Sequence, residues 1–130
     1  MSSGIQVMKF VIGLGASLRA MPSHLLYRAD RDLVHGQLPA EQVRGGRPTS
    51  GVWEAPVPGV ACGLWEHSAG VSTDVEVHEV FVVLSGCARI EVEGGSDLHV
   101  GPGDVVELAA GARTVWIVSE PLRKFWVAVG

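Results

Sequence analysis

The sequence predicts an all-β fold, a small sandwich or barrel preceded by an N-terminal arm. Within residues 51–129, short valine-rich runs are separated by turn residues at intervals of about 8–12 positions, as in sandwiches and barrels. Gly94-Gly95 joins two alternating runs and predicts a hairpin, and Gly101-Pro102-Gly103-Asp104 predicts a second turn. No helical periodicity of useful length interrupts these runs. We therefore assign residues 1–48 to the arm and residues 49–130 to the β domain.

The β domain is predicted to contain seven strands, at residues 60–66, 75–84, 88–93, 97–100, 105–108, 114–120 and 124–129. The arm has weaker signals. Residues 28–33 and 39–43 are predicted to form a turn or two of helix. Residues 5–11 are expected to add a strand to a partner or to the edge of the barrel itself. Residues 44–51 are rich in glycine, proline and polar residues, which predicts a loop.

Composition and charge limit the possible functions. The chain has 130 residues and a net charge of −4, which disfavours nucleic acid as a partner. No apolar run is long enough to span a membrane, and the N-terminus is a poor secretory signal, so we expect a cytoplasmic protein. Only 18% of the residues are charged, below the usual quarter, which suggests that a homodimer covers part of the surface. Cys62 and Cys87 have no metal-binding spacing and are expected to be free thiols.

The segment 75–84 carries the clearest functional signal. If it is one strand, Glu79 shares a face with apolar side chains, among them Phe81 and Val83, while Glu76 and His78 lie on the opposite face. An unpaired carboxylate in such surroundings costs several kcal/mol. Glu79 must therefore have a partner or face a polar cavity, and Lys124 is a possible partner.

Residues 79–111 contain glycines and acidic residues at characteristic intervals. Glu79-Val80-Phe81-Val82-Val83-Leu84-Ser85-Gly86 is followed by Gly103-Asp104 and by Gly111. This frame resembles the two motifs of the cupin superfamily. With Gly51-Val52-Trp53, Pro58-Gly59, Trp116 and Arg123-Lys124, it is similar to the group of (S)-ureidoglycine aminohydrolase-like and ethanolamine-utilisation-type cupins. The resemblance covers residues 49–129 and implies a single jelly-roll barrel, a double-stranded β-helix.

Metal-binding cupins of this superfamily hold the ion with two histidines and a glutamate from the first motif and a third histidine from the second. Aligned on Glu79, the histidine positions are occupied by Thr73, Val75 and Thr114, so Glu79 alone remains. A spacing one residue longer would add Asp74. One carboxylate does not hold a transition metal against water, so no metal and no cofactor are expected. In the alternative, a bulge would turn Glu76 and His78 inward to join Glu79 as a metal site.

Three functional hypotheses follow. In the first, a small polar molecule binds in the barrel without the histidine metal site; Glu79 and Lys124 anchor it, and Thr73, Thr114, Phe81, Trp53 and Trp116 complete the site. In the second, the protein is a metal-dependent enzyme, aminohydrolase- or isomerase-like, with Glu79 as the candidate catalytic residue. In the third, it is a non-catalytic structural or interaction subunit.

Overall fold

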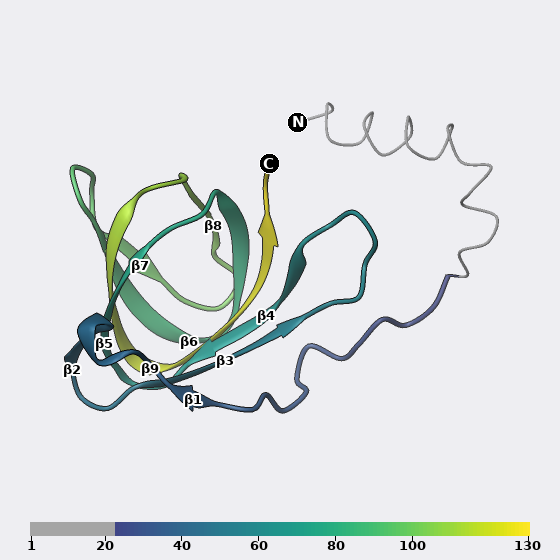
Figure 1. The fold of residues 1–130 in the computed structure, drawn as a ribbon, viewed down its shortest axis with the longest axis horizontal. Coiled ribbons are helices and arrows are strands. Elements are labelled where there is room, and N and C mark those ends of the chain that lie inside the picture. The colour runs from purple at the N-terminus through teal and green to yellow at the C-terminus, as the bar shows by residue number, and fades with distance from the viewer. Residues whose placement is uncertain (1–22) are drawn as a thin grey trace.

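The computed structural model describes residues 23–130, which form a curled antiparallel β-sheet. The sheet is a half-barrel (Figure 1), consistent with the cupin jelly roll, and confirms the predicted all-β class. In this part of the chain, no helix is long and apolar enough to cross a membrane.

Two long strands form the centre of the sheet. These are β6 (Glu79–Val92) and β9 (Arg113–Ala128), which pair along almost their whole length. On the other edge of β6 lie β7 (Leu98–Val100) and β8 (Val105–Leu108). On the other edge of β9 lie β4 (Cys62–His67) and β5 (Gly70–Val75). The sheet continues from β4 to β3 (Thr49–Glu54).

Residues 36–45 connect two distant edges of this sheet. They form β1 (Gly36–Gln37), which pairs with β3, then the short 3-10 helix η2 (Ala40–Gln42) and β2 (Val43–Gly45), which pairs with β5. The helical turn predicted at 39–43 is therefore present. The one predicted at 28–33 is not, because only a turn forms there. Residues 5–11 lie outside the described residues.

Several predicted strands have different limits in the structure. The runs 88–93 and 114–120 are not separate strands but parts of β6 and β9, because β-bulges carry each long strand past its turn-type residues, Gly86 and Pro121. The predicted strand 75–84, by contrast, belongs to two separate strands. Val75 ends β5, Glu79 begins β6, and residues 76–78 form a link between them. Strands β3 and β5 were not predicted, since Thr49–Glu54 and Gly70–Val75 contain few large apolar residues.

The core lies on the concave side of the half-barrel (Figure 1). Its buried side chains come mainly from β6 and β9 and pack as one cluster, with Phe81, Val83, Ile90, Trp116 and Leu122 among them. The turn predicted at residues 101–104 is present. At Gly101-Pro102-Gly103-Asp104, the carboxylate of Asp104 accepts a hydrogen bond from the N–H of Gly101, at 2.8 Å.

Gly86 is required where β6 passes β9. Its φ is +86°, and a Cβ placed there would lie 2.0 Å from the carbonyl oxygen of Pro121. Gly94 has a similar φ of +76°, but a Cβ there would meet nothing within 4 Å. We expect Gly94→Ala to cost only the backbone penalty of about 1–2 kcal/mol. We expect Gly86→Ala to cost several kcal/mol more or to prevent folding, measured by urea denaturation. Equal losses in the two variants would contradict the proposed close approach.

Candidate functional site

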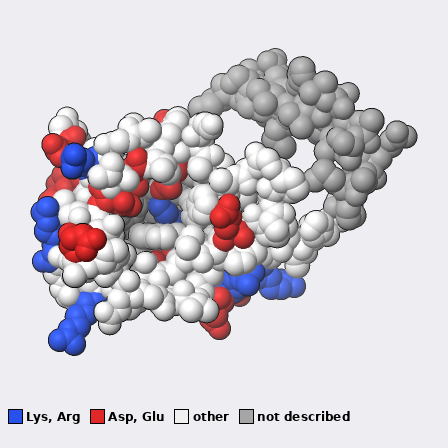
Figure 2. All heavy atoms as spheres, in the orientation of Figure 1, with Lys and Arg blue, Asp and Glu red and all other residues white. Residues whose placement is uncertain are grey.

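The concave side of the half-barrel contains a cavity of about 420 Å³. Strands β4, β5, β6 and β9 supply its deep wall, and Leu38 and Gln42 of the 36–45 segment close one side. Figure 2 shows this hollow with acidic residues near its rim and a basic residue inside it. The size lies within the range of small-molecule sites.

A buried ion pair lies at the bottom of the cavity. Nζ of Lys124 on β9 donates a hydrogen bond to Oε1 of Glu79 on β6, at 2.5 Å. Lys124 is 5% exposed and Glu79 7% exposed. In the register Lys124 stands opposite Val83 and Glu79 stands opposite Ala128, so the pair is not a direct cross-strand pair. The two side chains meet because both point into the cavity. The partner that the sequence analysis required for Glu79 is therefore Lys124.

Three aromatic rings surround the ammonium of Lys124. Its Nζ lies 4.3 Å from the ring centre of Phe81, 4.7 Å from Trp65 and 4.9 Å from Trp116. All three distances are within the range of cation–π attraction. The rings also exclude water, which strengthens the attraction between Lys124 and Glu79. The site thus stabilises a cation by both a carboxylate and an aromatic cage.

Glu76 lies inside the cavity, although the sequence analysis placed it on the outer face. The link at residues 76–78 interrupts the strand, so the alternation of faces starts again at Glu79 and both glutamates point inward. Oε2 of Glu76 accepts hydrogen bonds from the hydroxyl of Thr114, at 2.5 Å, and from Nε1 of Trp116, at 3.0 Å. Burial raises the pKa of Glu76, while these two hydrogen bonds oppose the rise.

Asp74 on β5 adds a third carboxylate at the mouth of the cavity. Its Oδ1 accepts a hydrogen bond from the N–H of Val75, at 2.8 Å. Burial raises the pKa of Asp74; the hydrogen bond from Val75 and the positive charge of Lys124 oppose the rise, and the negative charge of Glu79 adds to it. The negative charge of Asp74 in turn contributes to raising the pKa of Glu76, so the two acids interact.

His67 on β4 is a buried neutral group in the cavity wall. Its Nδ1 donates to the carbonyl oxygen of Ser68, at 2.6 Å, because a carbonyl can only accept. Burial lowers the pKa of His67, and the nearby His35 adds to this effect. The neutral ring then accepts a hydrogen bond at Nε2 from the hydroxyl of Ser72, at 2.8 Å. Both nitrogens are therefore occupied by the protein itself.

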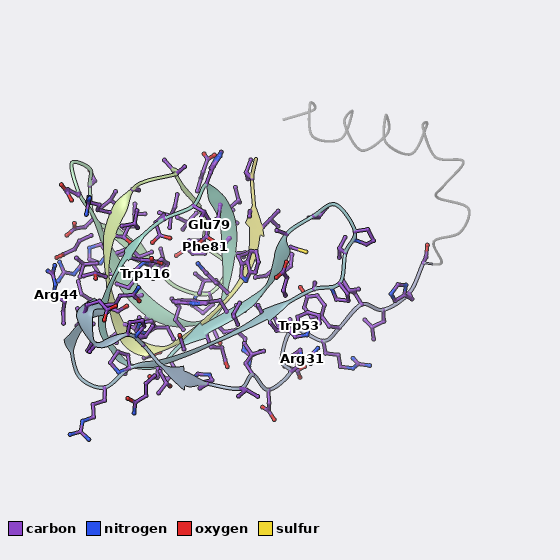
Figure 3. The ribbon with its side chains drawn as sticks, viewed as in Figure 1. Arg31, Arg44, Trp53, Glu79, Phe81 and Trp116 are labelled. Carbon is purple, nitrogen blue, oxygen red and sulfur yellow. The ribbon has the colours of Figure 1, made fainter. Side chains whose placement is uncertain are left out.

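The structure brings most of the candidate residues together but leaves two outside. Glu79, Lys124, Thr73 and Trp116 line the cavity, while Thr114 and Phe81 touch residues that do. Figure 3 shows Glu79, Phe81 and Trp116 inside the half-barrel, with Trp53 and Arg31 on its outer side. Trp53 was expected as a wall of the site. That interpretation needs correction, because Trp53 points away from the cavity and packs against Tyr27 and Arg31.

His78 is also outside the cavity. Its Nε2 lies 2.7 Å from Oε2 of Glu107, an exposed residue of β8. The alternative metal site of Glu76, His78 and Glu79 is therefore not assembled. Among residues 23–130, no group of three or more histidine, cysteine or acidic side chains is placed to hold a metal ion. These side chains do not match the histidine site of metal-binding cupins. Glu79 is moreover already paired with the positive charge of Lys124.

Several cavity residues were missed from the sequence. Trp65 and His67, two positions apart on β4, share the face toward the cavity, and so do Ser72 and Asp74 on β5. The i, i+2 spacing of Trp65 and His67 places both on one face of a strand and is a usable signal in the sequence. Strand β5 itself was not recognised, so Ser72 could not be placed.

The buried pair gives a first prediction about stability. Lys124→Met leaves Glu79 without a cation, so we expect a loss of about 3–5 kcal/mol in the free energy of unfolding. Glu79→Gln should cost less, because the aromatic rings still surround the ammonium. The double variant should lose less than the sum of the single losses, as measured by urea denaturation in a double-mutant cycle. Strictly additive losses would show that the two groups do not interact.

The raised pKa of Glu76 gives a second prediction. A carboxyl group whose pKa is higher in the folded state stabilises the fold at low pH and loses this contribution as pH rises above its ordinary value of 4.5. Glu76→Gln keeps an oxygen for Thr114 and Trp116 but does not titrate. We expect the stability of the wild type to fall relative to Glu76→Gln between pH 4 and pH 8. The exposed Glu54→Gln is the control, and parallel curves for wild type and Glu76→Gln would refute the assignment.

Comparisons with known proteins identify related folds. Residues 54–126 match the family model described as the EutQ-like cupin domain. Similar solved structures include EutQ of Clostridium difficile, at 16% identity and TM-score 0.56, covering 62% of this chain and 68% of that one. Another is a protein of unknown function from Pseudomonas syringae pv. tomato, at 21% identity and TM-score 0.66, covering 78% of this chain and 46% of that one.

A third similar structure is a putative ethanolamine utilization protein from Salmonella typhimurium, at 15% identity and TM-score 0.53, covering 75% of this chain and 94% of that one. At these identities the likeness concerns the fold alone. No curated protein matches the sequence.

Proposed function

Because this chain belongs to the family of EutQ-like cupin domains, we propose that it binds a small polar organic molecule in the interior of the half-barrel, without the histidine metal site of other cupins. The observation that carries this proposal is the buried Lys124–Glu79 pair at the bottom of an open cavity of about 420 Å³. A purely structural core does not need such a pair, since replacing a buried ion pair by well-packed apolar residues is often neutral or stabilising.

The surroundings of the pair support binding over a structural role. Polar side chains and indole rings both line the wall, so a ligand would meet hydrogen-bonding groups and flat apolar surface together. Glu79 and Lys124 anchor polar groups of the ligand, Thr73 offers a hydroxyl, and Trp116 forms a wall. Thr114 acts through Glu76, which it holds by a hydrogen bond. A homodimer and a cytoplasmic location remain predictions from the sequence.

Thermal-shift screening of small acids, amines and neutral polar molecules tests this proposal. A ligand at ten times its Kd should stabilise the protein by about 1.4 kcal/mol, or roughly 4–8 °C in Tm. We expect Glu79→Gln to reduce or abolish the shift. Because that variant is destabilised, the Glu79→Gln/Lys124→Gln double variant serves as a second reference in which no buried charge of the pair is left unpaired. The absence of any ligand-induced shift, or equal shifts in all three proteins, would refute the proposal.

A further inference from the structure

The three carboxylates of the cavity share one arrangement. Each has one oxygen held by the protein: Oδ1 of Asp74 by the N–H of Val75, Oε2 of Glu76 by Thr114 and Trp116, and Oε1 of Glu79 by Lys124. The second oxygen of each acid has no hydrogen-bond partner among residues 23–130. In the same part of the chain, no side-chain oxygen or nitrogen is buried without a partner. The free oxygens of Glu76 and Glu79, both residues 7% exposed, are therefore accessible from the cavity.

The charges of the cavity do not balance. Three carboxylates and one ammonium line it, and burial lowers the pKa of His67, which favours its neutral form. Glu79 is neutralised by Lys124 at 2.5 Å. Among residues 23–130, no cation is in hydrogen-bond contact with Asp74 or Glu76, and the repulsion between these two acids is part of what raises the pKa of Glu76. A ligand that brings a positive charge would relieve this repulsion, whereas an anion would increase it.

The hydrogen-bonding groups of the acids also favour a positively charged ligand, because such a ligand carries hydrogen-bond donors. Carboxylate oxygens only accept, and both Nε1 of Trp116 and the hydroxyl of Thr114 are already used on Glu76. The free oxygens of the three acids can therefore bind only groups of the ligand that donate hydrogen bonds. Around these acceptors lie Trp65, Trp116 and Trp126, and exposed valines at the mouth, Val52, Val75 and Val77. Such a wall suits a charged head with a short apolar chain.

We propose that the ligand of this cavity is a small organic monocation, a protonated primary amine or a guanidinium compound, whose charged head binds the free oxygens of Glu76 and Asp74. This inference rests on the proposed binding function and specifies the class of ligand. Lys124 illustrates the same recognition within the protein, as an alkylammonium bound by a carboxylate and aromatic rings. The ligand head lies beside it on the next pair of acids, and its chain extends along Trp126 toward the valines.

The test uses isothermal titration calorimetry of the full-length protein at pH 8 with four probes of similar size: n-propylamine, n-propylguanidine, 1-propanol and butyrate. At this pH both amine-type probes are charged, and Asp74 and Glu76 are more fully ionised than at neutral pH. We expect the two cations to bind at least tenfold more tightly than 1-propanol. We expect butyrate to show no binding.

Variants assign the binding to the acids. Glu76→Gln keeps the hydrogen bonds to Thr114 and Trp116, so it should fold, and we expect it to weaken n-propylamine binding at least tenfold. Glu54→Gln removes the same charge from an exposed residue of β3 and should leave the affinity unchanged. Butyrate binding more tightly than n-propylamine, or Glu76→Gln binding the amine as well as wild type does, would overturn this inference and leave the proposed function standing. If no probe binds and the thermal-shift screen finds no ligand, both proposals fail.

Discussion

A buried ammonium held between one carboxylate and three aromatic rings organises the interior of this half-barrel. Lys124 and Glu79 lie on the two long central strands, and their attraction is strong because the surrounding rings exclude water. An unpaired charge at either position would be costly, so β6 and β9 must bring these two side chains together although they are not directly opposite in the sheet. Glycine at position 86 and the bulges near it allow both strands to bend, and the register between the strands shifts there, between Val83 and Ala88.

The same constraint explains why the cavity differs from a histidine metal centre. In metal-binding cupins the glutamate of the first motif is a ligand of the ion, whereas here a lysine of the adjacent strand forms an ion pair with it. Threonines stand at two positions where histidine would be expected, and one of them, Thr114, supports Glu76. Each of the three acids accepts a hydrogen bond from a group of the protein itself. What remains open to the cavity is a set of acceptor oxygens framed by indole rings.

The comparisons and the geometry limit the function in different ways. The family match fixes the fold, and the similar structures, at low identity, add nothing about a reaction. The ligand class has to come from the side chains themselves: their charges, their unused hydrogen-bonding capacity and the space beside them. Lys124 is informative because it shows that this interior holds an alkylammonium group between a carboxylate and aromatic rings.

The sequence by itself determined the all-β class, the family frame from Glu79 to Gly111, and the need of Glu79 for a partner, because alternation, turn residues and the cost of a buried charge are local properties. It did not reveal that Glu76 faces inward or that Trp53 faces outward. In one continuous strand, residues three positions apart, such as Glu76 and Glu79, lie on opposite faces. Only the tertiary structure shows that residues 76–78 interrupt the strand, so that the alternation of faces begins again at Glu79. Trp53 was misplaced for a related reason, since β3 was not recognised and the face it presents depends on its pairing with β4. Which charges meet across strands far apart in sequence is decided by register, and register is a property of the folded sheet.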